Sequence, residues 1–120
     1  MDERIAKATE KFIALAEAQL ARAERIKAQK DFINYDELDK IIIGVCGGDG
    51  IGPVITAESA RVLEYLLKDE VEKGKVEFRN IDGLTIENRA KHNKAIPDDV
   101  LEELKKCHVI LKGPTTTRCV

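Results

Sequence analysis

The sequence has 120 residues, about the size of one domain. Apolar residues make up 43% and charged residues 35%, a balance typical of a folded protein and not of a disordered chain. The net charge is −2, with 20 basic and 22 acidic residues interspersed, so we expect no nucleic-acid partner. No apolar run approaches the ~18 residues of a membrane span and the N-terminus carries no signal-peptide core, which predicts a cytoplasmic protein without membrane association.

The cysteines and histidines show no metal-binding pattern. Cys46, Cys107 and Cys119 form no CxxC pair and are odd in number, so neither a zinc knuckle nor a disulfide framework is indicated. The histidines are His92 and His108, and His108 lies in an apolar run, where a packed residue is more common than a ligand. We therefore predict reduced thiols and no metal site in this chain.

Residues 3–30 are rich in Ala, Glu, Lys and Arg and contain no Gly or Pro, which predicts one long helix. Such a helix is marginal alone in water and needs a neighbour, and an exposed apolar stripe would make the chain self-associate. Two interpretations stand level: an arm for oligomerisation or docking, and a helix packed on its own domain. The apolar stripe consists of residues spaced by three, four or seven: Ile5, Phe12, Ala16, Leu20, Ala23 and Ile26.

A mixed polar connector, residues 31–40, leads to the mostly β-branched run at 41–46, which is typical of a strand buried on both faces of a parallel sheet. The glycine-rich segment 47–53 follows, and Pro53 suits the first turn of a helix. Gly74 is expected to stop that helix. Its predicted apolar face consists of Ile55, Ser59, Val62, Leu63 and Leu66.

The second half of the chain continues the alternation. Residues 75–79 have the pattern of a half-exposed strand, and residues 81–95 are polar, with a turn signal at Asp82-Gly83. A short helix over 97–106 precedes a buried-type strand at 107–112. This order predicts an α/β fold with parallel strands, right-handed crossovers and ligands outside the carboxyl ends of the strands.

Two loops fall at such strand ends. The first, Gly-Asp-Gly-Ile-Gly-Pro at 48–53, suits an anion because backbone N–H groups and the helix dipole point at it, although a tight structural turn also explains its glycines. Its spacing matches neither the Rossmann nor the Walker fingerprint. The second, Gly-Pro-Thr-Thr-Thr at 113–117, offers three hydroxyls for a carboxylate or amide, although solvated threonines are the commoner case. Asp49 and Lys112 have simple interpretations as a turn former and a strand-end surface charge.

Together the two loops resemble those of the β-decarboxylating dehydrogenases, the isocitrate/isopropylmalate dehydrogenase family. The resemblance rests on Gly48-Asp49-Gly50-Ile51-Gly52-Pro53 after a first strand, followed some sixty residues later by Leu111-Lys112-Gly113-Pro114-Thr115-Thr116-Thr117. It covers residues 40–117, and the Lys-Gly-Pro-Thr-Thr-Thr loop resembles the isocitrate dehydrogenase branch. Isopropylmalate dehydrogenases share the first loop, but their second loop is usually a glycine-rich segment. The leading helix resembles an extension found in some members.

The resemblance implies oxidation of a 2-hydroxy acid by NAD or NADP, then Mg²⁺- or Mn²⁺-assisted decarboxylation, so that isocitrate yields 2-oxoglutarate as in the tricarboxylic acid cycle. It also implies a homodimer. The implied cofactor-binding residues are Ile51, Thr115, Thr116 and Thr117, and Thr117 would also contact a substrate carboxylate. Lys112 would lie near that site, with no direct role assigned.

Two departures from the family pattern are Val54, where glutamate is usual, and Arg118, where proline is usual. Arg118-Cys119-Val120 is therefore expected to be a foreign tail, which affects the placement of Thr117. In the family the arginine cluster, the catalytic tyrosine and lysine, and the metal-binding aspartates follow the threonine loop, so we expect no catalytic residue here. The 120 residues alone are expected to be an inactive N-terminal part of a dehydrogenase.

These observations predict a helical extension at residues 1–36, followed at 37–120 by the first part of a dehydrogenase α/β domain. The main hypothesis is an NAD(P)-dependent isocitrate dehydrogenase. An isopropylmalate or other 3-substituted malate dehydrogenase is the alternative in the same class. A non-catalytic assembly module, in which the helix 3–30 recruits a partner, is the alternative from another class.

Overall fold

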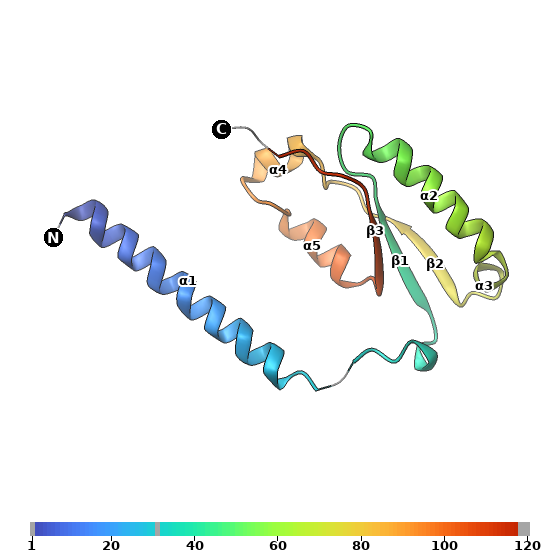
Figure 1. Cartoon of the computed structure of the whole chain (residues 1–120), viewed down its shortest axis with the longest axis horizontal. Coiled ribbons are helices and arrows are strands. Elements are labelled where there is room, and N and C mark those ends of the chain that lie inside the picture. Colours follow the sequence, from blue (N-terminus) through green and yellow to red (C-terminus); the bar gives the residue numbers. More distant parts are fainter. Residues whose placement is uncertain (1, 31, 118–120) are drawn as a thin grey trace. The chain divides into compact units, whose positions relative to one another are not determined.

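The computed structural model of the chain describes residues 2–30 and 32–117 and contains both helices and a parallel sheet. The chain divides into two compact units, residues 1–34 and 35–120, and each is considered by itself. Figure 1 shows the elements in chain order: α1 (Glu3–Ala28), the 3-10 turn η1 (Tyr35–Glu37), β1 (Ile41–Cys46), α2 (Gly52–Leu66), α3 (Lys68–Glu72), β2 (Val76–Asn80), α4 (Ile86–His92), α5 (Asp98–Lys105) and β3 (Val109–Lys112).

The first unit is the long helix α1, as predicted. Asp2 caps its N-terminus, because a carboxylate oxygen accepts a hydrogen bond from the Arg4 amide at 2.9 Å. No residue of α1 is buried, and Phe12 and Leu20 expose 70% and 67% of their surface. The packing partner that this helix needs is therefore not found within its own unit.

The second unit is built on a three-stranded parallel sheet in the order β2-β1-β3, which confirms the α/β prediction. β1 is the central strand, and Ile43, Gly44 and Cys46 are buried, as its unbroken apolar run predicted. The prediction of a second buried strand at 107–112 was wrong. β3 begins only at Val109 and forms an edge of the sheet, so Val109 and Ile110 are 44% and 46% exposed.

Helix α2 packs on the sheet through small residues. Its buried positions are Gly52, Thr56 and Ala60, so the predicted apolar face was wrong except at Leu63, which is half-buried. Ile55, Val62 and Leu66 are 44%, 56% and 69% exposed. Small residues at every fourth position let the helix backbone lie close to the strand, and the bulky residues then point outward. The predicted single helix to Gly74 is also interrupted at Leu67, and α3 begins at Lys68.

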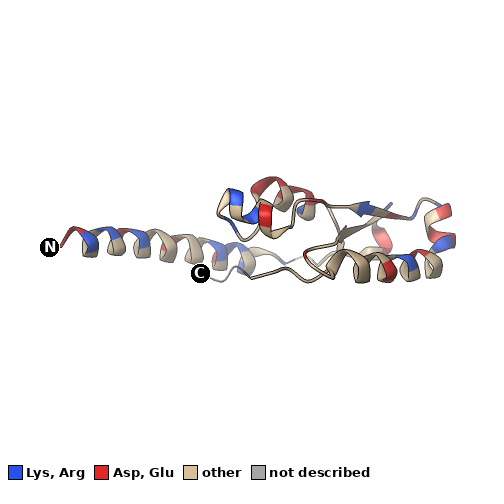
Figure 2. Cartoon of the chain, turned by 90° about the horizontal axis from the view of Figure 1, so that it is seen from above, with Lys and Arg blue, Asp and Glu red and all other residues tan. Residues whose placement is uncertain are grey.

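Helix α5 contributes to the main apolar core. Figures 1 and 2 show α5 and α2 on opposite faces of the sheet. Val100 and Leu104 of α5 are buried with residues of β1 and of the segment after β2, in a cluster that comprises Cys46, Ile81, Leu84, Val100 and Leu104, with Cys107 packed against it. This cluster holds α5 against the sheet.

Helix α4 lies in the polar stretch 81–95, for which the sequence predicted a turn but no helix. Thr85 caps it by accepting a hydrogen bond from the Asn88 amide at 3.4 Å, and Asn93 ends it in the left-handed conformation with φ 49°. The seven-residue helix has no buried residue, so hydrophobic periodicity could not reveal it.

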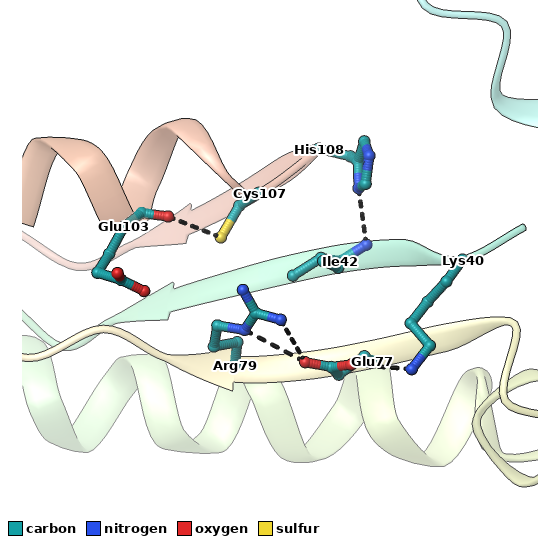
Figure 3. Close-up of polar contacts among 7 residues, drawn as sticks. All are labelled: Lys40, Ile42, Glu77, Arg79, Glu103, Cys107 and His108. Atoms are coloured by element: carbon teal, nitrogen blue, oxygen red, sulfur yellow. Dashed lines mark hydrogen bonds and ion pairs between the residues drawn. The ribbon is translucent and has the colours of Figure 1, made fainter. Parts of the chain in front are cut away.

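Polar contacts along the strands, drawn in Figure 3, account for several charged and polar residues. Glu77 of β2 accepts hydrogen bonds from Arg79 at 2.7 Å and from Lys40 at 3.1 Å, and these two cations lower its pKa. His108 is half-buried rather than packed in the core, and its Nδ1 accepts a hydrogen bond from the Ile42 amide at 3.0 Å. His108 thus extends the pairing of β3 with β1.

Within the described residues, no helix combines the length and the apolar character that crossing a bilayer requires.

Candidate functional site

The two predicted loops begin side by side at the carboxyl end of the sheet. Cys46, the last residue of β1, is the register partner of Lys112, the last residue of β3. The glycine-rich loop 47–53 and the threonine loop 113–117 therefore leave neighbouring parallel strands at their carboxyl ends, where open α/β sheets bind ligands.

Backbone hydrogen bonds join the two loops. The Gly113 amide donates to the Cys46 carbonyl, and the Asp49 amide donates to the Pro114 carbonyl, both at 2.8 Å. Close approach makes glycine necessary, because a Cβ on Gly48 would overlap the Pro114 carbonyl and a Cβ on Gly113 would overlap that of Gly47. Gly48 also has a φ of +76°, which other residues rarely adopt.

The side chain of Asp49 adds a third connection, between the two loops and helix α4. One carboxylate oxygen accepts a hydrogen bond from the Thr116 amide at 2.9 Å, and the other accepts one from the Ile86 amide at 2.7 Å. Asp49 is only 9% exposed. These amide donors, first that of Thr116, lower the pKa of the Asp49 carboxyl group, and the nearby Arg89 and Lys112 lower it further.

Two cations hold the threonine loop from its other side. Arg89 of α4 donates to the carbonyl oxygens of Ala95 at 2.7 Å and of Thr116 at 2.9 Å. Lys112 donates to the carbonyl oxygen of Gly113 at 2.9 Å and to the Thr115 hydroxyl at 3.3 Å. Thr116 is therefore fixed through both its amide and its carbonyl group.

The structure places the predicted site residues on the surface of this joined pair of loops. Ile51 precedes α2 and is 66% exposed, and Thr116 and Thr117 are exposed while Thr115 is half-buried. The threonine loop and the loop that carries Ile51 are brought together by Asp49. Arg118, Cys119 and Val120, the predicted foreign tail, lie outside the described residues.

A pocket lies beside the threonine loop. It has a volume of about 290 Å³, and Arg89, Lys112 and Thr115 supply its polar groups among apolar side chains from α5 and β3. Arg89 and Lys112 already donate hydrogen bonds to backbone carbonyl oxygens, so the exposed lining is almost wholly apolar and by itself defines no carboxylate site.

The glycine-rich loop is not free to cradle an anion with all of its backbone amides. The Asp49 amide bonds to Pro114, and the Gly52 amide bonds to the Asp49 carbonyl at 2.8 Å. The glycines at 48, 52 and 113 are explained by the packing of one loop against the other, which favours the structural-turn interpretation for most of this loop.

The described residues offer neither a metal site nor a reactive thiol. Among residues 2–30 and 32–117, no group of three or more His, Cys, Asp or Glu side chains could hold a metal ion. The residues described here therefore do not fit a Mg²⁺ or Mn²⁺ site. Cys46 and Cys107 are free thiols, and burial raises the pKa of Cys46, which makes it a packed residue rather than a nucleophile.

A parallel sheet with helices on both faces and two loops beyond the carboxyl ends of its strands defines the class, an open α/β protein. Residues 42–119 match the family model described as isocitrate/isopropylmalate dehydrogenase, so the chain belongs to this dehydrogenase family. The chain is 36% identical, over 66 residues, to a 3-isopropylmalate dehydrogenase of Staphylococcus saprophyticus. That match covers 55% of this chain and 18% of the relative, so the chain spans about a fifth of the relative's length. No solved structure matches.

Sequence reasoning missed two residues of this site. Asp49 was interpreted as a turn former, although its side chain links three segments. Arg89 lies in the unpredicted helix α4 and carried no motif. The available signal for Asp49 was an acidic residue between two glycines. Its partners, the amides of Ile86 and Thr116, are distant in the sequence, so only the fold reveals them.

Proposed function

We propose that this chain supplies part of the cofactor and substrate surface of an NAD(P)-dependent dehydrogenase that oxidises and decarboxylates isocitrate. The observation that carries the proposal is the joined pair of loops, in which Asp49 fixes the exposed threonine segment to the loop that bears Ile51. Family membership supports the dehydrogenase class, and the Lys-Gly-Pro-Thr-Thr-Thr sequence supports isocitrate.

The residues present fit a nicotinamide cofactor and an acidic substrate. The exposed Ile51 side chain offers an apolar surface for a ring, and the hydroxyls of Thr115, Thr116 and Thr117 can bond to ribose hydroxyls and to a carboxylate. When bound, the cofactor would accept hydride from the hydroxy acid. The contribution of the chain itself is to orient both ligands through these groups.

3-Isopropylmalate is the alternative substrate. The relative from Staphylococcus saprophyticus, a 3-isopropylmalate dehydrogenase, favours it. Both substrates are 2-hydroxy acids, so the same loops would serve either one. We further propose that the 120 residues alone do not turn over either substrate and that the larger protein is a homodimer.

The experiment is a chimera in which residues 42–117 of this chain replace the corresponding segment of the Staphylococcus saprophyticus enzyme. We expect the chimera to reduce NAD or NADP with isocitrate or 3-isopropylmalate, measured by absorbance. Replacing Thr116 and Thr117 together by valine should lower kcat/KM about tenfold or more, because each lost hydrogen bond is worth about 0.5–1.5 kcal/mol.

The matched control replaces Thr116 and Thr117 by serine, which retains the hydroxyl groups and should keep kcat/KM within about threefold. Equal kcat/KM values for the valine, serine and unaltered chimeras would show that the hydroxyls contact neither ligand. A folded chimera, judged by circular dichroism, that reduces neither cofactor with either acid would count against the dehydrogenase proposal itself.

A further inference from the structure

Helix α1 contains a sequence repeat that its exposed surface leaves without a partner. Residues 3–30 divide into four consecutive heptads: ERIAKAT, EKFIALA, EAQLARA and ERIKAQK. Each begins with a glutamate, and the second position is basic in all but one. The helix runs unbroken over Glu3–Ala28, so the repeat is present on a continuous surface.

A seven-residue period keeps equivalent residues on one face when a helix winds around another helix. In α1 one such face is mostly apolar, and we call it the stripe. Its centre is the last position of the first three heptads, Thr9, Ala16 and Ala23, and larger side chains border that centre on both sides. The large apolar residues of the bordering rows are Ile5, Phe12 and Ile26 on one side, in a row that also contains Gln19, and Ile13 and Leu20 on the other, in a row that also contains Lys27. All five large apolar residues are at least 50% exposed.

A row of glutamates runs along one edge of this stripe, and a row of basic residues lies beyond the other edge. The glutamates 3, 10, 17 and 24 follow the edge beside Ile13 and Leu20. The basic residues Arg4, Lys11 and Arg25 lie beyond the opposite edge, where Arg22 borders the stripe. Figure 2 shows acidic and basic residues along the helix. Within the helix Glu3 forms an ion pair with Lys7 at 2.9 Å, and both side chains are exposed.

We infer that α1 pairs in parallel with α1 of a second copy of this chain. A second copy of α1 has the same seven-residue period, so the two stripes can pack along their whole length. The charged rows beside the stripe determine whether the two helices run parallel or antiparallel. In a parallel pair the two-fold axis runs along the helices, so the acidic edge of each helix faces the opposite edge of the other, which carries Arg22 and no acidic residue. In an antiparallel pair the two acidic edges would face each other and repel. The inference is independent of the dehydrogenase chemistry.

The test compares two double variants of the full 120-residue chain by sedimentation velocity. Ala16→Glu with Ala23→Glu places charges at the centre of the stripe, whereas Ala14→Glu with Ala21→Glu places the same charges on the opposite face of the same helix. The two variants match in composition, net charge and helix propensity.

We expect a concentration-dependent dimer for the unaltered chain and for the 14/21 variant. For the 16/23 variant we expect a dissociation constant raised by at least about tenfold, because each copy would carry two unpaired charges in the interface. A monomer for the unaltered chain, or equal dissociation constants for the two variants, would overturn the inference.

The salt dependence tests the direction of the pair. Sodium chloride screens the attraction between the glutamates of one helix and Arg22 and the basic row beyond it on the other, so the dissociation constant of the unaltered chain should rise with salt concentration. A dissociation constant that falls as salt is added would indicate that like charges face each other, and would overturn the parallel arrangement.

Discussion

A Gly113→Ala variant is expected to lose about 3 kcal/mol of unfolding free energy, the upper end of the usual cost of overpacking. The new Cβ would overlap the Gly47 carbonyl and crowd the Thr56 hydroxyl, so the two loops would have to separate. Urea unfolding followed by circular dichroism measures the change.

Gly50→Ala is the matched control for this substitution. Gly50 has a φ of +56°, but a Cβ there would have no atom within 4 Å. It should therefore cost only the conformational penalty of about 1 kcal/mol. An equal loss of unfolding free energy in the two variants would contradict the claim that close packing of the loops requires glycine at position 113.

A Leu104→Ala variant is expected to lose about 2–4 kcal/mol of unfolding free energy, because it would leave a cavity in the core that α5 shares with the sheet. Leu104 is only 9% exposed and packs with Val100, Ile81 and Leu84. Leu66→Ala on α2 makes the same chemical change at a position that is 69% exposed, and should stay within about 0.5 kcal/mol of the unaltered chain. Comparable losses in the two variants would contradict this assignment of the core.

The sequence predicted the strands and helices whose pattern follows directly from burial or composition. β1 is buried on both faces and is uniformly apolar, and α1 is a long run of good helix formers. β3 was predicted to be buried because its residues are apolar. Its exposure depends on its edge position in the strand order, which composition does not encode.

The apolar face of α2 was misplaced for a related reason. Hydrophobic periodicity selects bulky residues, but α2 packs through Gly52, Thr56 and Ala60. Helix α4 has no buried residue and therefore no periodic signal, so Arg89 could not be assigned to the site. The two loops could be found from their sequences, but the bonds that join them depend on the parallel pairing of β1 with β3.

The central claim is that the carboxylate of Asp49 joins the glycine-rich loop, the threonine loop and α4. Because hydrogen bonds from the Thr116 and Ile86 amides favour the ionised form, the folded pKa of Asp49 lies below the ordinary value of 3.8. A lowered folded pKa means that the bonds stabilise the fold above the ordinary pKa. That stabilisation is lost as the pH falls through the lower, folded value.

The most direct measurement is an acid titration of the chain by NMR, which follows the amide proton shifts of Thr116 and Ile86. The predicted result is that both amides titrate together, with one midpoint below 3.8, and that Asp49→Asn abolishes this titration. Amide shifts that do not move with pH, or that move with a midpoint at or above 3.8, would contradict the claim that Asp49 holds the two loops together.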